Sequence, residues 1–242
     1  MYLLSNARVL AVMAKAHPDD EEAAASAVRR RLPAPQRRVQ ILAVAGDLFS
    51  REGIDESSMR KIASKAGVSP AVLYRHFADK DALLFALTES FFERLSAAMR
   101  EAFATVDGPV ARMRALMRTY LTFGFDNPHE YRLTFMTALP RLKRDADMKA
   151  FRQRARSGAV IEPQELTLGM HCFGMLERGI SDLVAAGHTR QSNPAALTEA
   201  IWASGHGLVS LVITHDEFGW TERDALVDTA IDVMLNGLLR HP

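Results

Sequence analysis

The chain has 242 residues, which is enough to bury a substantial core in one large domain or two small ones. Its hydrophobic share of 48%, charged share of 24% and net charge of +1 are those of an ordinary globular protein, and the whole-chain charge does not point to a nucleic-acid partner. The single cysteine, Cys172, excludes an intramolecular disulfide and a cysteine-based zinc site.

The distribution of charge is more informative than its sum. Residues 29–80 contain eleven Lys or Arg residues and only five Asp or Glu residues. A locally basic segment attracts phosphate even where the rest of the molecule balances its charge. The N-terminal third is therefore the part of the chain best suited to contact DNA.

The first 16 residues are fairly apolar, but Arg8 and Lys15 interrupt them and acidic residues follow at once, which argues against a signal peptide. No run approaches the roughly 18 uninterrupted apolar residues that a membrane span needs. We therefore expect a cytoplasmic protein with no membrane partner.

Apolar residues recur at spacings of three and four along nearly the whole chain, and alternating β-branched runs are absent. Proline and glycine residues divide this pattern into short segments. The expected helices cover residues 36–51, 58–65, 69–76, 79–105, 109–125, 128–138, 143–156, 164–187, 194–215 and 221–239. The sequence thus predicts an all-α fold after an N-terminal extension, residues 1–35, that has an alanine-rich stretch able to form a helix.

The extension contains Ala16-His-Pro-Asp-Asp-Glu21, which resembles the metal-binding signature of zinc-dependent N-acetylglucosaminyl deacetylases. In that family the histidine and an aspartate hold zinc, and the neighbouring aspartate acts as a base on metal-bound water. That fold also needs a further histidine from a long α/β chain, whereas the chain after Pro35 has a helical pattern. We favour acidic residues opening a helix at its positive end.

Three arginines, at positions 29–31, precede the first helix of the basic segment. Flexible basic arms in such a position reach the minor groove or the DNA backbone. The alternative, which the sequence leaves open, is a solvated helix end.

Two short helices joined by a tight turn are predicted between residues 58 and 77. Ser58 and Ser69 are natural N-caps, and Pro70 suits the first turn of a helix. Gly67 can adopt the positive φ that ends a helix. The apolar residues then fall on inward faces: Met59, Ile62, Ala63, Ala66, Val72, Leu73 and Phe77. This pattern is typical of a helix-turn-helix, whose second helix enters the major groove; a plain α-hairpin is the alternative.

The outward residues of this motif are the candidates for DNA contacts. Short side chains at Ser69, Pro70 and Ala71 would let the backbone approach base edges. Tyr74, His76 and Lys80 are placed to contact phosphates. Arg60 is the candidate for a direct base contact, because arginine pairs well with guanine. The full predicted set is Arg37, Ser58, Met59, Arg60, Ser69, Pro70, Ala71, Tyr74, Arg75, His76 and Lys80.

The segment from Arg37 to about Leu84 resembles the DNA-binding domain of the TetR/AcrR family of bacterial regulators. The matching pieces are Ile41-Leu-Ala-Val-Ala-Gly-Asp-Leu-Phe49, Gly53, Ser58-Met-Arg-Lys-Ile-Ala63, Ala66-Gly-Val-Ser69, Leu73-Tyr-Arg-His-Phe77, Lys80 and Leu83-Leu84. The resemblance implies a first helix bracing the motif and a long helix, here 79–105, joining it to a regulatory domain. It also implies a homodimer on a near-palindromic operator. Ala71 departs from the Gly or Thr of many members, which leaves base preference open.

The C-terminal half resembles the variable ligand-binding domain of the same family. Asn127-Pro-His-Glu-Tyr-Arg-Leu133 and Trp202-Ala-Ser-Gly-His-Gly-Leu208, with its Trp-x-x-x-His-Gly pattern, are similar to one C-terminal subtype, the WHG type. Apolar residues with isolated polar groups could line a pocket for a small, largely apolar effector, with plain core as the alternative. The candidates are Phe123, Tyr131, Phe135, Met136, Met170, His171, Phe173, Met175, Trp202 and His206.

The last two helices are amphipathic and lie where this family builds its dimer. The predicted dimer contacts are Leu208, Leu211, Val212, Leu226, Ile231, Met234 and Leu238. Burial of these residues within one subunit is the alternative.

These inferences combine into an all-α regulator with a helix-turn-helix domain at 36–84 and a ligand-binding and dimerisation domain at 85–242. We expect a repressor that binds double-stranded DNA as a homodimer and is released by a small molecule. We expect no enzymatic activity, no cofactor and no metal. A helical scaffold protein with an inactive helix-turn-helix is the main alternative, and a zinc-dependent deacetylase is a remote one.

Overall fold

The computed structural model describes residues 33–137, 149–150, 153–154 and 167–240. Helices dominate these ranges, and the β pairing within them is an isolated bridge between Thr189 and Leu239. The principal helices are α3 (Ala34–Glu52), α4 (Met59–Lys65), α5 (Pro70–His76), α6 (Lys80–Ala104), α7 (Pro109–Asp126), α8 (Pro128–Tyr131), α10 (Leu168–Ala185), α11 (Pro194–Thr214) and α12 (Arg223–Leu238). A π-helix, η2 (Arg132–Met136), continues α8, and a 3₁₀ turn, η5 (Asp216–Phe218), links α11 to α12. The predicted all-α fold is confirmed.

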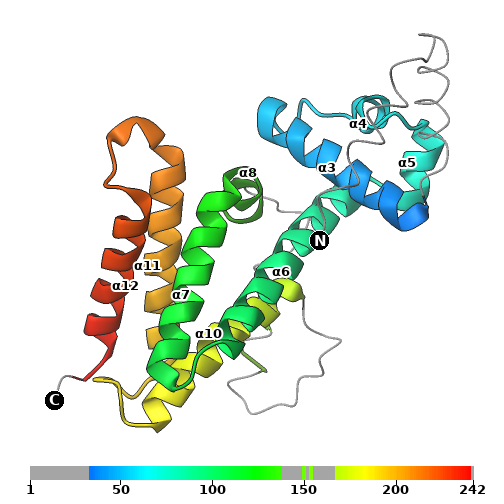
Figure 1. The fold of residues 1–242 in the computed structure, drawn as a ribbon. Coiled ribbons are helices and arrows are strands. Elements are labelled where there is room, and N and C mark those ends of the chain that lie inside the picture. The colour runs from blue at the N-terminus through cyan, green and yellow to red at the C-terminus, as the bar shows by residue number, and fades with distance from the viewer. Residues whose placement is uncertain (1–32, 138–148, 151–152, 155–166, 241–242) are drawn as a thin grey trace, which may run out of the picture.

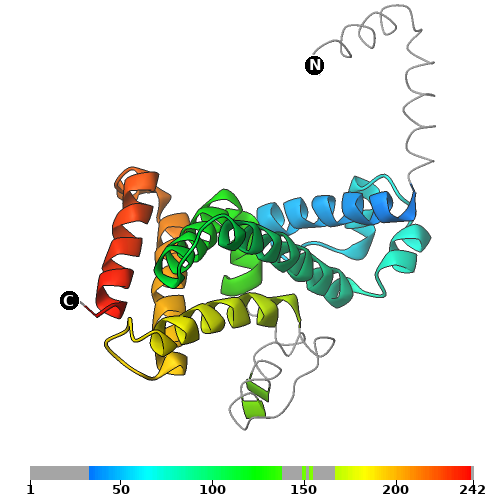
Figure 2. The ribbon, with the colours of Figure 1, turned by 60° about the horizontal axis from the view of Figure 1, so that its bottom comes forward.

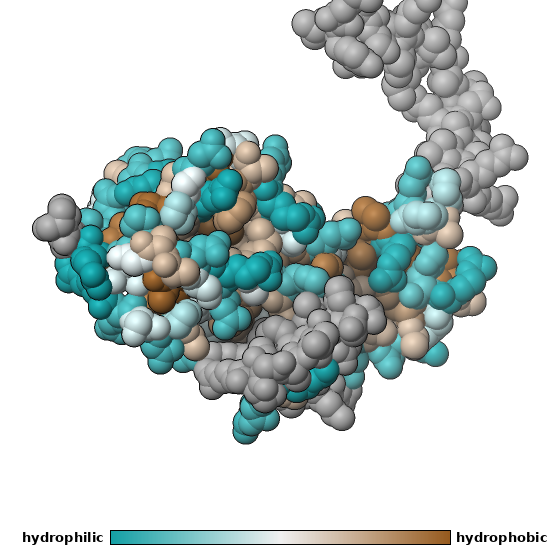
Figure 3. Space-filling view, turned by 90° about the horizontal axis from the view of Figure 1, so that it is seen from below, coloured by the Kyte–Doolittle hydropathy of each residue, from teal (hydrophilic) through white to brown (hydrophobic). Residues whose placement is uncertain are grey.

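The helices form a small head and a larger bundle (Figures 1 and 2). The head consists of α3, α4 and α5, and the bundle of α7, α10, α11 and α12. Helix α6 begins in the head and runs into the bundle, where it packs against α7 and α10. The short α8 and η2 lie between the two parts, and α8 contacts both α3 and α6. Seen from below, the described surface is mostly hydrophilic with small apolar patches (Figure 3).

The head buries its own hydrophobic cluster. Ile41 from α3, Ile62 from α4 and Leu73 from α5 are completely buried in it. Helices α4 and α5 have only 7 residues each, so packing of their apolar faces rather than intrinsic propensity stabilises them. The remaining members are Ala45, Leu48, Phe49, Met59, Ala63, Ala66, Phe77, Leu83, Leu84, Ala86, Leu87 and Leu133. Leu133 is the member that comes from outside α3–α6, because it belongs to η2.

The bundle buries a second cluster, to which α6 also contributes. Phe91, Phe92, Leu95 and Met99 follow the head residues of α6 at helical spacing and face this core. Helix α6 thus contributes side chains to both hydrophobic clusters. A shift of α6 in the bundle would therefore displace its buried residues in the head.

Helix α12 is fixed to α7 by exposed ion pairs. Arg114 pairs with Asp232 at 2.6 Å, and Arg118 pairs with Asp228 one turn away. Exposed pairs of this kind contribute about 0–1 kcal/mol each, so they orient α12 more than they stabilise it.

Two expected helices differ from the observed ones. The helix expected at 128–138 is a single turn of α8 followed by the π-helix η2, and the one expected at 164–187 begins at Leu168 within the described residues. The helix expected at 143–156 and the whole extension 1–32 lie outside the described residues, apart from 149–150 and 153–154.

Gly124 is required by close packing between α7 and its neighbours. A Cβ at this position would lie 2.8 Å from Cγ1 of Val209 and 3.1 Å from the Tyr131 ring. We expect Gly124→Ala to lower the free energy of unfolding by about 1–3 kcal/mol, despite the better helix propensity of alanine. Thermal unfolding measures this. Gly237→Ala on α12 is the matched control, because no heavy atom lies within 4 Å of its added Cβ. Equal melting temperatures for the two variants would contradict the packing argument.

Candidate functional site

The helix-turn-helix is built by the local signals that the sequence contains. The Ser58 hydroxyl accepts a hydrogen bond from the amide of Lys61 at 3.2 Å, and the Ser69 hydroxyl accepts one from the amide of Val72 at 3.3 Å. Gly67 has φ +62°, the left-handed conformation that lets the chain turn between α4 and α5. Both N-caps and the glycine turn have the geometry that the sequence predicts.

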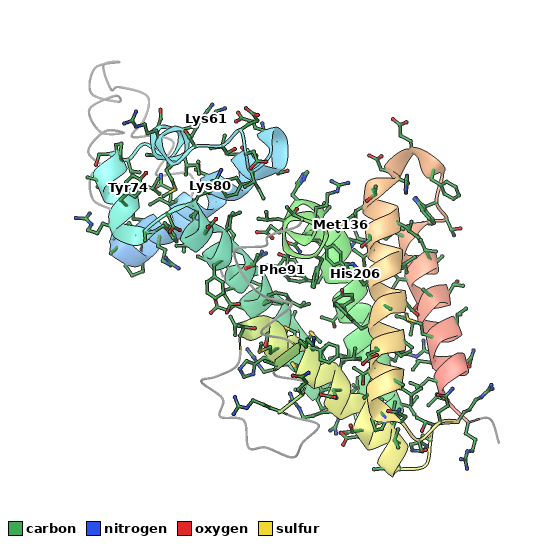
Figure 4. All side chains as sticks on the ribbon, turned by 180° about the vertical axis from the view of Figure 1, so that it is seen from behind. Lys61, Tyr74, Lys80, Phe91, Met136 and His206 are labelled. Carbon is green, nitrogen blue, oxygen red and sulfur yellow. The ribbon has the colours of Figure 1, made fainter. Side chains whose placement is uncertain are left out.

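The start of α5 presents an exposed face of short side chains. Ser69, Pro70 and Ala71 are all exposed, and so are Tyr74 and Arg75 on the following turn. Tyr74 keeps 50% of its surface exposed, although aromatic side chains usually bury most of theirs. In Figure 4 Tyr74 and Lys61 lie on the head, well away from the bundle side chains Phe91 and His206. This face is shaped to let a helix enter a groove.

Two of the residues predicted to contact DNA are buried instead. Arg37 is only 8% exposed, and its guanidinium donates to the side-chain oxygen of Gln40 at 2.9 Å. Met59 is buried in the head cluster because it lies on the inward face of α4. Both side chains support the head from inside in this structure, so neither is presented to DNA and we leave both out of the proposed contact surface.

Two further candidates are partly engaged within the head. The Lys80 ammonium donates to the carbonyl of Ile54 at 2.8 Å and so ties the loop before α4 to the start of α6. His76 is half-buried beside Phe77. Burial first, and then the positive charges of Arg75, Arg38 and Arg37, lower the pKa of His76 below its usual value of 6.5. His76 is therefore neutral near pH 7.

Arg38 is a basic residue that the sequence analysis did not single out. Its guanidinium lies over the Phe77 ring, 4.5 Å from the centroid, and donates to the carbonyl of His76 at 3.4 Å. It thereby joins α3 to the end of α5. The sequence signal for this role is the pair of neighbouring arginines at 37 and 38. Helical periodicity places Arg37 on the inward face of α3 and Arg38 on the outward face.

The bundle contains a cluster of aromatic rings at the meeting point of α6, α7, α8–η2, α10 and α11. The Phe135 ring is its centre: its centroid lies 5.9 Å from that of Phe91, 4.7 Å from that of Tyr131 and 5.4 Å from that of His206. Phe91 of α6 and His206 of α11 are labelled in Figure 4. Most of its pairs are edge-to-face, which is the favoured geometry for aromatic contacts.

A chain of hydrogen bonds crosses this apolar cluster. The hydroxyls of Tyr120 and Tyr131 are 2.8 Å apart, and the Tyr131 hydroxyl is 2.7 Å from Nδ1 of His206. Nε2 of the same imidazole is 3.4 Å from the hydroxyl of Ser210. The Trp202 ring lies beside this chain, with its centroid 5.9 Å from that of His206.

Each member of this chain is a hydroxyl or an imidazole, which can both donate and accept, so the chain can run in either direction. A neutral imidazole has one donor nitrogen and one acceptor nitrogen and can take part in both. Burial lowers the pKa of His206 and raises that of Tyr120 to about 12, which keeps both groups uncharged.

The predicted effector residues divide into those that join the cluster and those that do not. Phe123, Tyr131, Phe135, Phe173, Trp202 and His206 make ring contacts within it. Met170 is buried and Met175 packs against the bundle core, whereas Met136 is 41% exposed. His171 is half-buried. The structure adds Phe91, Phe92, Tyr120 and Ser210 to this set. Tyr120 could have been predicted from spacing, because it is an aromatic residue with a polar hydroxyl and lies one turn before Phe123.

The Asn127-Pro-His-Glu-Tyr motif has a positioning role. The Arg94 guanidinium of α6 donates to the side-chain oxygen of Asn127 at 3.0 Å and pairs with the carboxylate of Glu130. These contacts hold α8 against α6, and the next residue, Tyr131, points into the aromatic cluster. Arg94 is a second residue that the sequence analysis missed.

Acid is expected to destabilise the folded state through the two shifted histidines. The pKa of His206 and that of His76 are both lowered on folding, chiefly by burial. The unfolded chain therefore binds more protons below about pH 6.5, so this contribution is present above that pH and is lost as pH falls towards the folded pKa values. We expect the melting temperature to drop between about pH 7.5 and about pH 5.5. His206→Gln should reduce the drop, whereas His188→Gln at an exposed position should not; an unchanged profile for His206→Gln would contradict this.

The two C-terminal helices leave a face uncovered in the single chain. Only four of the 21 residues of α11 are buried, and its outward face consists of small residues around Gly207 with Leu211, which is 51% exposed. On α12 the outward residue Val233 is 67% exposed. By length and composition alone, α11 is also the one helix of the described residues that could cross a membrane, which is weak support for a span.

Two of the residues predicted to contact the partner subunit do not lie on the surface. Ile231 and Leu238 are buried in the subunit's own bundle core, because they share the inward face of α12 with Val227 and Leu235. Leu208, Val212 and Met234 are partly buried against the same core. Leu211 and the partly exposed Leu226 remain on the surface, joined by Gly207 and Val233, which the sequence analysis did not name.

The deacetylase-like stretch at 16–21 lies outside the described residues. Among those that are described, no three His, Cys, Asp or Glu side chains come together in a way that could hold a metal ion.

Comparison with known families agrees with this architecture. Residues 41–87 match the family described as bacterial regulatory proteins, tetR family, and residues 113–235 match the tetracyclin repressor-like C-terminal domain. The second match alone covers more than half of the chain. The chain belongs to the TetR family. It is therefore a DNA-binding transcription regulator and not an enzyme.

Individual relatives match a part of the chain. The chain is 35% identical over 105 residues to the transcriptional activator FasR of Mycolicibacterium smegmatis, covering 43% of this chain and 48% of FasR. It is 36% identical over 81 residues to the transcriptional repressor Rv1474c of Mycobacterium tuberculosis, covering 34% and 41%. The chain thus spans less than half of the length of these two relatives.

Solved structures extend the likeness of fold to most of the chain. A protein of unknown function from Rhodococcus sp. RHA1 has a TM-score of 0.64 at 26% identity, covering 84% of this chain and 96% of that one. The fatty acid degradation regulator FadR of Bacillus halodurans has a TM-score of 0.67 at 17% identity, covering 85% and 97%.

Proposed function

We propose that this regulator is a cytoplasmic repressor that binds a near-palindromic operator as a homodimer and is released by a small, largely apolar effector. The exposed N-terminal face of α5 is the observation that carries the proposal. Ser69, Pro70 and Ala71 present the backbone of the helix start, and Tyr74 and Arg75 flank it. A helix start with short side chains can approach base edges, and the flanking residues can contact phosphates.

Arg60 on α4 adds base recognition to this face. It is exposed on the second residue of the helix that Ser58 caps. Arginine reads guanine through two hydrogen bonds in the major groove, and such a pair contributes about 1–3 kcal/mol of discrimination. The proposed DNA contacts are thus Ser58, Arg60, Ser69, Pro70, Ala71, Tyr74 and Arg75, with His76 and Lys80 at the edge of the surface.

The uncovered faces of α11 and α12 support the homodimer. An exposed apolar face on two neighbouring helices marks a protein–protein contact. A twofold axis through Gly207 would bring the α11 helices of two copies together, because small side chains allow a close approach of helix backbones. Two heads related by that axis would meet two half-sites of one operator.

The aromatic cluster supports an apolar effector with few polar groups. Effector sites are mostly apolar, with a small number of polar groups that fix orientation. The cluster joins rings from α6, α7, α8–η2, α10 and α11 to one chain of hydrogen bonds, and Trp202 reaches the surface with 40% of its area exposed. An effector that enters beside Trp202 would displace rings that also contact α6.

The test combines stability with operator affinity. A panel of apolar small molecules is screened for a rise in melting temperature, and each hit is then added to the complex of the protein with the DNA upstream of its own gene. The proposal expects at least one hit that weakens operator binding by about 5- to 150-fold. A hit that stabilises the protein and leaves operator affinity unchanged contradicts release by the effector.

The direction of regulation needs its own measurement, since the relatives include the activator FasR and the repressor Rv1474c. A reporter under the upstream promoter is expected to rise when the gene for this regulator is deleted. A fall in reporter expression would favour activation.

A further inference from the structure

The aromatic cluster has one side that the described residues leave accessible. Tyr131 is 1% exposed, whereas Tyr120, Phe135 and His206 are only half-buried, although their rings meet inside the bundle. Trp202 continues this side to the surface, where it is 40% exposed. The ring centroids lie 6.5 Å apart for Tyr120 and Phe135, 5.4 Å for Phe135 and His206, and 5.9 Å for His206 and Trp202. These four contiguous rings, Tyr120, Phe135, His206 and Trp202, form an aromatic wall.

The hydrogen-bond chain that runs along this wall contains one hydrogen more than its links use. It has three links, which join Tyr120 to Tyr131, Tyr131 to His206, and His206 to Ser210. Its members carry four hydrogens, because three are hydroxyls and a neutral imidazole has one N–H. Each link uses one hydrogen, so the fourth is left at one end of the chain.

The tautomer of His206 decides which end keeps the extra hydrogen. When Nε2 carries the hydrogen, it donates to Ser210, and Tyr131 donates to Nδ1. Tyr120 then donates to Tyr131 and presents only lone pairs to any other group. When Nδ1 carries the hydrogen, every link reverses, and Tyr120 keeps a hydrogen that it can donate. The Tyr120 hydroxyl is therefore suited both to an acceptor and to a donor placed against the wall.

The polar groups of the wall are uncharged. Burial raises the pKa of Tyr120 to about 12, and burial rather than a neighbouring charge lowers the pKa of His206. Arg94 lies over the Phe123 ring at the edge of the cluster, but it is already paired with Glu130. An ion placed against the wall would lose its hydration without gaining a counter-charge. A neutral oxygen would exchange a hydrogen bond to water for one to Tyr120.

We propose that the aromatic wall binds a neutral, apolar effector that carries one hydroxyl or ketone oxygen, and that this oxygen forms a hydrogen bond with the Tyr120 hydroxyl. The inference rests on the proposed function, since it names the chemical class of the effector. A ketone oxygen can only accept, so it requires Tyr120 to donate and the hydrogen of His206 to lie on Nδ1. An alcohol can both donate and accept, so it is compatible with either tautomer.

A matched set of decalin derivatives tests the class of effector. 2-Decalone and 2-decalol are neutral, whereas decalin-2-carboxylate and decalin-2-ammonium carry one charge on the same skeleton near neutral pH. Isothermal titration of each compound into the full chain measures its dissociation constant. We expect the two neutral compounds to bind at least about tenfold more tightly than the two ions, because burying an unpaired charge costs more than burying a hydrogen-bonded neutral oxygen.

Tyr120→Phe tests the contact itself, because it keeps the ring and removes the hydroxyl. We expect it to bind 2-decalone about 3- to 10-fold more weakly, which corresponds to the loss of one neutral hydrogen bond. Thr119→Val is the matched control. It removes the hydroxyl of the adjacent residue, which donates to the carbonyl of Ala115 in the same helix at 2.9 Å, and it should leave the affinity unchanged. Equal affinities for 2-decalone in the two variants would contradict the contact.

The tautomer of His206 distinguishes this contact from a merely structural effect of Tyr120. Nitrogen NMR of protein labelled with nitrogen-15 histidine reports which ring nitrogen carries the hydrogen, and His206→Gln identifies the signals of His206. We expect the hydrogen on Nδ1 when 2-decalone is bound. In Tyr120→Phe, addition of 2-decalone should no longer influence the balance of the two tautomers.

Three results would overturn the inference: failure of both neutral compounds to bind, equal or tighter binding of either ion, and a ketone complex with the hydrogen of His206 on Nε2. Tighter binding of the ammonium ion would identify a cation–π site instead. Addition of 2-decalone to the complex with the DNA upstream of the gene tests the proposed function separately. A ketone that binds as expected and leaves operator affinity unchanged contradicts release by the effector, but not the class of ligand.

Discussion

Arg60→Ala is expected to weaken operator binding by about 5- to 150-fold per half-site and to relax the choice of base at one position. The reason is geometric. Arg60 is exposed at the start of α4, beside the face of α5 that we place in the major groove. Loss of a bidentate pair to guanine costs about 1–3 kcal/mol. Fluorescence anisotropy with the upstream DNA, and with single-base variants of it, measures both effects.

Arg178→Ala is the matched control for charge, because Arg178 is an exposed arginine on α10 in the bundle. It should leave operator affinity within about twofold, since screening removes most of a distant exposed charge at physiological salt. Arg60→Ala could instead weaken binding to all DNA sequences equally and lower the slope of the logarithm of the binding constant against the logarithm of the salt concentration by about one. In that case Arg60 contacts a phosphate and not a base.

Gly207→Phe is expected to dissociate the homodimer and to abolish tight operator binding. Its side chain would project from the outward face of α11, where no heavy atom of the subunit lies within 4 Å of an added Cβ. The subunit should therefore fold normally. Overpacking costs about 1–3 kcal/mol for each of the two phenylalanines at the interface. The two costs add, so the dimer dissociation constant should rise at least about 30-fold. Light scattering after size exclusion measures the mass.

The control is the same enlargement at another exposed small residue. Ala97→Phe on α6 adds a phenyl ring to the surface of the bundle, away from α11 and α12, and should remain dimeric. A dimeric Gly207→Phe protein with unchanged operator affinity would place the dimer on another face.

The helix-turn-helix could be predicted from sequence because its determinants are local. Two serine caps, one glycine with positive φ and one proline in a first turn act within four residues of their own positions. The inward residues of α4 and α5 follow from helical spacing alone. The same spacing separates Arg37 from Arg38, because Arg37 lies one turn before the buried Ile41 on the inward face of α3.

The C-terminal half could be predicted less well because apolar residues there occupy more than one face of each helix. Spacing identifies the apolar residues of α12, but it does not say that Ile231 faces the subunit's own core and Val233 faces outward. The hydrogen-bond chain joins residues up to 90 positions apart, Tyr120 and Ser210, so no local pattern reveals it. The π-helix likewise results from tertiary contacts of Tyr131 and Leu133.

The central claim is that the head binds a specific DNA sequence as part of a dimer. Fluorescence anisotropy of the purified protein on the DNA upstream of its own gene, titrated at several salt concentrations with competitor DNA present, tests it most directly. The account predicts saturable binding that survives the competitor and is lost on a scrambled sequence of the same length. Weak binding that salt erases, and that is equal on both sequences, would contradict it.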